Sequence, residues 1–461
     1  MIRLSAERLA TAAGANIMRE GGAGHPARAV TDSRETEPGD LFFGLRGENA
    51  DGGEFAGRAL GAGAWGVVVT PERARALDGR EGQGEGWILL APDPQRSLQR
   101  LATAWRREIG CPVVGITGST GKTSVKDICR AILPFRVHAS PENYNTEIGL
   151  PLAILSAPES PQTEVIVLEM AMRGRGQIAE LCEVAEPDVG AITNIGPVHL
   201  ELLGTLEAIV EAKAEILEGL RGRGRAVVPA DAEALEPHLH DRLVTITFGA
   251  GGDVFALRSR VREGSTLALV GTSAGEQEFR FPFTEAHNLT NALAAIAIGV
   301  ALDAPLAEMS RRAPEIGFSR LRGELLELRD GVVIVNDCYN ANPISMRAAL
   351  DHLASLEVRG RRVAVLGEMA ELGPQGPDYH REAGAHARQR AVGPIVGVGE
   401  LARHYAPDEW VPDARSAVPV VNGLLESGDA VLVKGSRAVG LELISDELAA
   451  MRGLRRPGGC A

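Results

Sequence analysis

The most constraining feature of the sequence is a short aliphatic run, PVVGIT (112–117), that leads directly into the glycine-rich loop GSTGKTS (118–124). Glycines let backbone amides close around phosphate oxygens, and a helix that starts at such a loop adds positive potential. We therefore predict a buried strand, a phosphate-binding loop and a helix from about Ser124. The loop residues expected around the phosphates are Gly118, Ser119, Thr120, Gly121, Lys122, Thr123 and Ser124.

Two residues of this loop carry the chemistry. Lys122 is expected to neutralise the β and γ phosphates, and the Thr123 hydroxyl is expected to reach Mg²⁺. The loop is shorter than the strict pattern, because Ile116 stands where its first glycine would be. A plain glycine turn between strand and helix is the alternative.

The rest of the chain divides into three blocks that predict a three-domain α/β protein. Residues 1–107 mix short strands with helices. In residues 108–314, aliphatic strands alternate with helices, which is typical of a parallel sheet, and alternating strands at 253–283 form a smaller β-rich part. Residues 315–461 repeat the strand–helix pattern and predict a Rossmann-like domain, in which ligands bind beyond the carboxyl ends of the strands.

Composition excludes several classes of protein. The formal net charge of −13 argues against a nucleic-acid-binding protein. The sequence contains no run of about 18 apolar residues, so no membrane span is predicted. The start of the chain does not resemble a signal peptide. The cysteines are scattered without a CxxC pair, so we expect reduced thiols in a cytoplasmic protein. They are Cys111, Cys129, Cys182, Cys338 and Cys460.

The loop ITGSTGKTS and further segments along the chain resemble the Mur ligase family, which also contains folylpolyglutamate synthase. In the middle block these segments are NYNTEIGLPLAIL (143–155), VLEMAMRGRGQI (167–178), TNIGPVHLELLG (193–204), AIVEAKAEIL (208–217) and AHNLTNALAA (286–295). The resemblance covers essentially the whole chain. It implies an ATP-dependent ligase that activates a carboxylate as an acyl phosphate and joins it to an amine.

The outer blocks indicate the substrates. NDCYNANPISM (336–346), LGEMAELG (366–373) and VKGSR (433–437) resemble the family members that add D-alanyl-D-alanine to UDP-N-acetylmuramoyl-tripeptide in peptidoglycan precursor synthesis. TDSRETEPGDLFFGLRGENADGGEF (31–55) resembles their uridine-nucleotide domain. The resemblance also implies a monomer. It does not tell whether the third peptide residue is diaminopimelate or lysine.

The resemblance implies a metal site in the middle block. Glu169 and His199 are expected to be ligands beside Thr123, and Lys213 is expected to be carbamoylated and to hold a second Mg²⁺. The alternatives are a solvated strand-end acid for Glu169, a structural residue for His199, and a surface lysine for Lys213.

The resemblance also implies where the nucleotide lies. His287, Asn288 and Asn291 are expected to contact adenine, because an amide can donate and accept together as purine edges require. A cluster that caps the helix is the alternative. Arg322 is expected to reach the ATP phosphates from the third block, with Arg320 as the rival.

The remaining candidates are substrate contacts. We expect the dipeptide to be bound by Asp337, Tyr339, Asn340, Asn342 and Lys434, with a purely structural loop as the alternative. The UDP-linked peptide is expected to contact Ser33, Arg34, Asn145 and Thr146. His199, Asp337 and solvent all remain open as the base that deprotonates the amine.

Three positions depart from the family pattern. Ala171, Ala286 and Leu321 stand where the family usually has glycine. A side chain is tolerable there only where φ is negative. Two other classes of function remain alongside this one: a different amide ligase of the same chemistry, and a nucleotide-binding switch without ligation.

Overall fold

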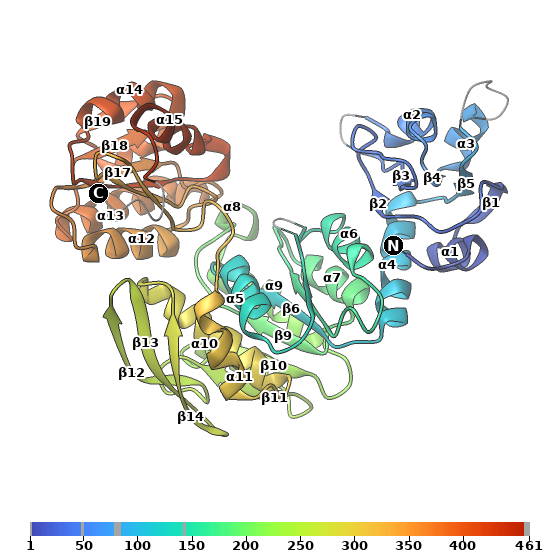
Figure 1. Ribbon diagram of the computed structural model, residues 1–461, viewed down its shortest axis with the longest axis horizontal. Coiled ribbons are helices and arrows are strands. Elements are labelled where there is room, and N and C mark those ends of the chain that lie inside the picture. Colours follow the sequence, from blue (N-terminus) through green and yellow to red (C-terminus); the bar gives the residue numbers. More distant parts are fainter. Residues whose placement is uncertain (1, 48–49, 78–83, 142–143, 456–461) are drawn as a thin grey trace.

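The computed structural model describes residues 2–47, 50–77, 84–141 and 144–455, and its chain forms three parts that follow one another in sequence (Figure 1). The first part (blue) contains a sheet of order β1-β5-β4-β3-β2, in which β1 is antiparallel to β5 and the other neighbours are parallel. Its strands are β1 (Asn16–Arg19), β2 (Ala29–Val30), β3 (Leu41–Phe43), β4 (Gly66–Val69) and β5 (Trp87–Leu90). Its helices are α1 (Ala6–Ala13), α2 (Ala56–Gly61) and α3 (Pro71–Leu77).

Helix α4 (Pro94–Ile109) connects the first part to the second. The side chain of Asp93 accepts hydrogen bonds from amides of the first turn, Pro94 lies at the start of the helix, and Gly110 ends it in the left-handed conformation with φ +71°. The helix contacts α1 on one side and α6 and α7 on the other. The predicted boundary at residue 107 falls in the last turn of this helix.

The central sheet is parallel throughout, in the order β11-β10-β9-β6-β8-β7. Its strands are β6 (Val113–Thr117), β7 (Val137–Ala139), β8 (Val165–Glu169), β9 (Val189–Ile192), β10 (Arg225–Pro229) and β11 (Val244–Phe248). The direction of strand order reverses at β6, which is where ligands bind in open α/β sheets.

Helices cover both faces of the central sheet. One face packs against α4, α6 (Gly149–Ser156), α7 (Gln177–Ala185) and α9 (Leu206–Glu218). The other packs against α5 (Lys122–Ile132), α10 (Ala286–Ala301) and α11 (Leu306–Arg312). Along β8, Ile166 and Leu168 belong to the first core, whereas Val165 and Val167 belong to the second. This explains the continuous aliphatic runs, since both faces of each strand are buried.

A separate antiparallel sheet stands beside the central one. It consists of β12 (Phe255–Arg262), β13 (Ser265–Thr272) and β14 (Gly275–Phe281). This is the small β-rich part that the alternating pattern at 253–283 predicts.

The C-terminal part has the strand order β15-β16-β20-β17-β18-β19, with β15 alone antiparallel to its neighbour. The strands are β15 (Glu324–Glu327), β16 (Val333–Asn336), β17 (Arg362–Gly367), β18 (Ile395–Val398), β19 (Glu409–Val411) and β20 (Ala430–Lys434). The helices are α12 (Pro343–Ser355), α13 (Gly376–Gln389), α14 (Ala414–Leu424) and α15 (Glu442–Arg452). The α/β fold class predicted from the sequence is confirmed.

Some details differ from the sequence-based expectations or fall outside them. Helix α5 begins at Lys122, two residues before the predicted start, because Gly121 is its N-cap. The predicted domain boundary at residue 314 falls inside the short 3₁₀ helix Ala313–Glu315. Among the described residues, no helix combines the length and apolar character needed to cross a bilayer. The four cysteines described are unpaired thiols, and Cys460 lies outside the described residues.

Candidate active site

The predicted phosphate-binding loop joins β6 to α5 at the centre of the sheet, and two of its glycines are required by their surroundings. Gly118 has φ +147°, and a Cβ there would lie 1.9 Å from Thr193 Oγ1. Gly121 has φ +80°, and a Cβ there would lie 2.5 Å from Asn291 Oδ1. Only glycine fits these two positions.

The loop that follows β9 holds the phosphate-binding loop in place. Ser119 Oγ accepts a hydrogen bond from the Gly196 amide at 2.9 Å and donates one to the Gly196 carbonyl at 3.0 Å. Asn194 Oδ1 accepts a hydrogen bond from the Thr120 amide at 2.8 Å. These partners lie in the TNIG segment, whose supporting role the sequence alone does not reveal.

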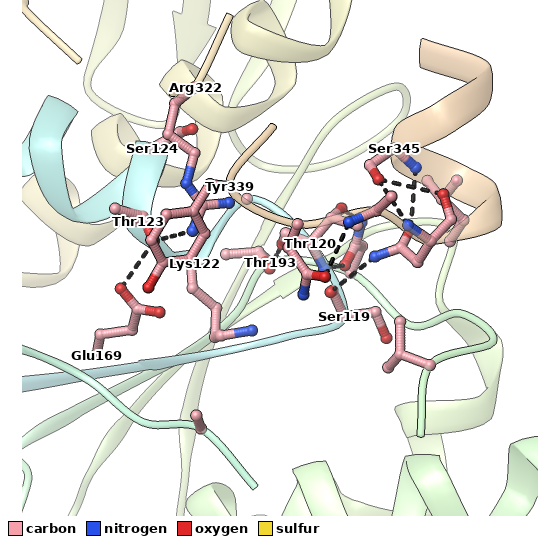
Figure 2. A pocket seen from close by; sticks show the side chains of 18 of the residues that line it. Ser119, Thr120, Lys122, Thr123, Ser124, Glu169, Thr193, Arg322, Tyr339 and Ser345 are labelled. Carbon is pink, nitrogen blue, oxygen red and sulfur yellow. Dashed lines mark hydrogen bonds between the residues drawn. The ribbon is translucent and has the colours of Figure 1, made fainter. Parts of the chain in front are cut away.

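Glu169 lies beside Thr123, and the Lys122 side chain extends from the same loop (Figure 2). Thr123 Oγ1 donates to Glu169 Oε2 at 2.9 Å, and Asn145 Nδ2 donates to Glu169 Oε1 at 3.0 Å. Lys122 Nζ donates to the Gly118 carbonyl at 2.8 Å. Burial lowers the pKa of Lys122; Glu169 opposes this effect and Arg322 adds to it. Because a bound anion favours the charged form of lysine, a phosphate group here would raise that pKa again.

Lys213 lies inside the protein and not on its surface. Its residue is 2% exposed, on helix α9, so the alternative of a solvated surface lysine is wrong. No hydrogen bond or ion pair reaches its ammonium group from any residue that the structure describes. Burial first, and then the charge of Lys122, hold the pKa of Lys213 well below its usual value. A buried lysine without an anionic partner favours the neutral amine.

The residues expected to contact the base lie within helix α10. Asn291 Nδ2 donates to Asn288 Oδ1 at 3.1 Å, while His287 is exposed toward the cavity. The N-cap of the helix is Glu285, whose side chain makes no capping hydrogen bond. The alternative that this cluster serves as a helix cap is therefore wrong for His287, Asn288 and Asn291.

Arg322 reaches the phosphate-binding loop from the C-terminal part of the chain (Figure 2). Its Nη2 donates to Thr123 Oγ1 at 3.1 Å, and its guanidinium carbon lies 3.9 Å from the centre of the Tyr339 ring. Its Nε is buried and has no hydrogen-bond partner within the described part of the chain. The rival Arg320 is on the surface beside Asp446, with its side chain 72% exposed.

The backbone next to Arg322 is strained. Leu321 has φ +64°, the left-handed region that costs a leucine about 1–2 kcal/mol. This is one of the three positions where the family usually has glycine. Ala171 and Ala286 are not among the residues with positive φ, so a side chain is tolerable there.

The loop after β16 is held by an ion pair between the buried Lys434 and the half-buried Asp337. Lys434 Nζ donates to Asp337 Oδ2 at 2.7 Å and to the Asn340 carbonyl at 3.0 Å. Asn342 is the N-cap of α12: its side chain accepts from the Ser345 amide, and its Nδ2 lies 3.5 Å from the Ser119 carbonyl. Asn342 therefore has a structural role, as the alternative interpretation of this loop predicts.

These elements surround one cavity of about 990 Å³ between the central and C-terminal parts. Most predicted site residues line it, including Ser119 to Ser124, Asn145, Thr146, Glu169, His199, His287, Asn288, Asn291, Arg322, Asp337, Tyr339, Asn340, Asn342 and Lys434. Gly118 and Lys213 are not among the residues that line it. Ser33 and Arg34 lie elsewhere, in the first part of the chain between β2 and β3, where Arg34 pairs with Asp32.

Comparison with known proteins agrees with this arrangement. Residues 116–299 match the Mur ligase middle domain, and residues 321–437 match the Mur ligase, glutamate ligase domain. The UDP-N-acetylmuramoyl-tripeptide–D-alanyl-D-alanine ligase of Bacillus subtilis (strain 168) is 35% identical over 438 residues, which cover 91% of this chain and 92% of the relative. The chain belongs to the Mur ligase family.

Further relatives carry the same name or fold. The ligase of that name from Escherichia coli (strain K12) is 30% identical and covers 94% of each chain. A crystal structure of MurF from Acinetobacter baumannii superposes with a TM-score of 0.85 at 27% identity, covering 96% of this chain and 98% of that one. MurF from Thermotoga maritima in complex with ADP superposes with a TM-score of 0.77 at 29% identity, covering 91% of this chain and 96% of that one.

One site residue of this Mur ligase was not anticipated from the sequence. Glu371, in the loop after β17, hydrogen bonds through its carboxylate to His199 Nδ1 and lies 3.7 Å from Arg173 Nε. The hydrogen bond to His199 lowers the pKa of Glu371 against the opposing effect of burial. Its carbonyl also accepts from the Glu201 amide at 3.2 Å. Glu371 therefore connects the C-terminal part to the residue expected to bind metal, a contact between residues far apart in sequence.

Proposed function

We infer that this Mur ligase adds D-alanyl-D-alanine to UDP-N-acetylmuramoyl-tripeptide and releases ADP and phosphate, in the synthesis of peptidoglycan precursors. The terminal carboxylate of the tripeptide attacks the γ-phosphorus of ATP and forms an acyl phosphate. The dipeptide amine then attacks the acyl carbon, and phosphate leaves. The observation that carries this function is the cavity that joins a phosphate-binding loop to a second domain in a chain 30–36% identical to ligases of that name.

The site offers cations where the reaction needs them. A carboxylate and a γ-phosphate are both anions, so their approach is favoured by positive charge. Lys122 is placed on the phosphate-binding loop, and the unpartnered Nε of Arg322 is suited to a phosphate oxygen. We propose that these two residues bind the phosphates, and that His287, Asn288 and Asn291 contact the base.

The residues present fit Mg²⁺. Thr123 and Glu169 bring a hydroxyl and a carboxylate together at 2.9 Å, and Mg²⁺ is commonly bound by one or two carboxylates with the phosphates of the substrate. In the described segments no group of three or more His, Cys, Asp and Glu side chains is arranged to hold a metal. Bound Mg²⁺ would supply charge stabilisation at the transferring phosphate. We propose Thr123, Glu169 and His199 as residues that would hold it.

A second ion would need one more anionic ligand, and we propose that carbamoylated Lys213 provides it. The neutral amine adds to CO₂ and releases one proton to solvent, which leaves an anionic carbamate. The buried, unpaired state of Lys213 supports this proposal, because the neutral amine is the form that reacts with CO₂.

The remaining assignments concern the other substrates. We propose that Asn340 and Tyr339 contact the dipeptide, in a loop that Lys434 and Asp337 keep in shape. Asn145 and Thr146 would contact the tripeptide end of the UDP-linked substrate. Ser33 and Arg34 would contact that substrate in the first domain.

The oligomeric state and the cellular location of the enzyme complete the proposal. We propose that the enzyme is monomeric. We also propose that it acts in the cytoplasm, where its thiols remain reduced.

The function is tested by phosphate release from ATP. Release should require both UDP-N-acetylmuramoyl-tripeptide and D-alanyl-D-alanine, and omission of either should leave only background. A nucleotide-binding switch would hydrolyse ATP regardless of both. Parallel assays with the diaminopimelate and lysine tripeptides would identify the third residue.

The two asparagines of the YNANP loop should behave differently. We expect Asn340→Ala to raise the KM of the dipeptide far more than the KM of ATP, because Asn340 is exposed in the cavity. Asn342→Ala should instead lower stability by about 0.5–2 kcal/mol, the usual cost of losing an N-cap. Steady-state kinetics and thermal unfolding of both variants separate the two roles. Equal changes in both KM values for Asn340→Ala would indicate a structural loop.

We predict that the C-terminal domain closes onto the central domain when ATP and the UDP-linked tripeptide bind. This closure should depend on Glu371. We expect Glu371→Gln to weaken closure a few-fold, on the order of 1 kcal/mol, because a partly exposed pair with His199 and Arg173 loses its charge. Small-angle scattering with an ATP analogue and the UDP-tripeptide should show less compaction than in the wild type, with hinge bending at residues 313–318. The exposed Glu357→Gln is the matched control. Wild-type compaction in Glu371→Gln would rule out this role.

A further inference from the structure

A buried Glu–His pair spans the interface between the central and C-terminal domains. Glu285 lies at the start of α10, and His352 lies near the end of α12. Their residues are 7% and 5% exposed. Glu285 Oε1 is 3.5 Å from His352 Nε2, which is too far for a good hydrogen bond.

Much of the hydrogen-bonding capacity of this pair is left unused by the residues that the structure describes. Both ring nitrogens of His352 are buried and lack a hydrogen-bond partner among the described residues. Glu285 Oε2 accepts from the Thr284 amide at 3.0 Å, whereas Oε1 faces the histidine. Buried polar atoms nearly always have partners, so groups like these, facing a cavity, are suited to a bound molecule.

The pair lies in the wall of the active-site cavity, and the Glu285 end of α10 is a short way along the helix from the phosphate-binding loop. Asn291, six residues along from Glu285, lies against Gly121 of that loop. Six helical residues span about 9 Å. Arg322 contacts Thr123, and the next residue, Gly323, lies beside Glu285. This end of α10 is therefore within reach of the base of a nucleotide whose phosphates lie at the loop.

The chemistry of the pair suits adenine. Adenine has an amino group at the position where guanine has a carbonyl oxygen, and its ring nitrogens accept hydrogen bonds. A carboxylate can accept from the amino group but repels the carbonyl oxygen. A neutral imidazole has one N–H that can donate to a ring nitrogen. Burial lowers the pKa of His352, against the charges of Glu285 and Asp337, so the neutral form is favoured.

We propose that Glu285 and His352 form the polar edge of the nucleotide-base pocket and select adenine over guanine. Glu285 accepts from the amino group, and His352 donates to a ring nitrogen when the C-terminal domain is closed. This proposal rests on the ATP-dependent function inferred above. It adds two residues, one from each domain, to those that recognise the base.

The test is binding of the methylene analogues of ATP and GTP to the full chain by calorimetry. Glu285→Gln keeps the shape but adds an amide donor, so the preference for ATP over GTP should fall about tenfold or more. His352→Leu should raise the Kd of the ATP analogue about tenfold and leave the KM of the dipeptide unchanged. His386→Leu is the matched control, since His386 pairs with Asp351 outside the cavity and should change neither value.

Several outcomes would overturn the proposal. An ATP-to-GTP preference in Glu285→Gln within twofold of the wild type would do so, as would a larger effect of His352→Leu on the dipeptide than on ATP. The latter would place the pair at the amine substrate. A wild type that binds neither analogue would instead overturn the inferred function itself, so the two failures are distinguishable.

Discussion

Lys122→Ala is expected to lower turnover by about 10²–10³-fold, the usual cost of losing one group that stabilises a transition-state anion. The ammonium of Lys122 makes its hydrogen bond to the Gly118 carbonyl of the same loop, so it contributes little to the packing of the domain. The variant should therefore fold normally and fail when the carboxylate approaches the γ-phosphate. Phosphate release measures the loss, and circular dichroism with thermal unfolding measures the fold.

The matched control for this prediction is Arg130→Ala on the same helix. Arg130 is exposed in the last turn of α5. Its replacement by alanine removes one positive charge, as Lys122→Ala does, but away from the loop. Its turnover should be close to that of the wild type. Near-normal turnover in a folded Lys122→Ala variant would mean that the nucleotide binds elsewhere.

Lys213→Ala should be folded and almost inactive, with a loss of about 10²-fold or more. This follows from the proposal that the carbamate helps to hold a metal ion, which is worth several kcal/mol of charge stabilisation. Removal of an unpaired buried amine leaves no buried charge behind, so the fold should survive. Acetate or formate in excess should restore part of the activity by supplying the missing carboxylate.

The carbamate has a readout that does not depend on activity. Wild-type enzyme equilibrated with ¹³C-bicarbonate should give a carbamate carbon signal in NMR, and Lys213→Ala should not. Glu207→Ala, an exposed change on the same helix, should keep both the signal and the activity. A fully active Lys213→Ala enzyme would eliminate the carbamate from the mechanism.

The parts of the site that the sequence predicts are those that lie on single local elements. The strand–loop–helix around Lys122 and the acid at the end of β8 follow from aliphatic runs that end in glycine or a polar residue. Because parallel strands end at the same edge of a sheet, Thr123 and Glu169 meet there, as their 2.9 Å contact shows. The sequence pattern predicts helix starts less accurately. Helix α5 starts earlier than predicted, because Gly121 is its N-cap.

The parts that the sequence left open depend on how the domains meet. Arg320 and Arg322 are equivalent in sequence terms, and only the packing shows that one faces the cavity and the other faces solvent. Glutamates near Lys213 in the sequence suggest a surface residue, yet Lys213 lies on the buried face of its helix. Glu371 lies in the LGEMAELG segment, but neither it nor His352 was predicted as a site residue, because each acquires its partner from the other domain.

The sequence by itself determined the α/β fold and the Mur ligase family and located the glycine-rich loop between β6 and α5, because these depend on short-range patterns of aliphatic residues, glycines and one lysine. The tertiary structure alone decided which side chains are buried, which arginine reaches the loop, and which residues pair across the interface. The physical reason is that burial and long-range pairing set the local dielectric and the hydrogen-bond partners of a group, and neither is encoded in its neighbours along the chain.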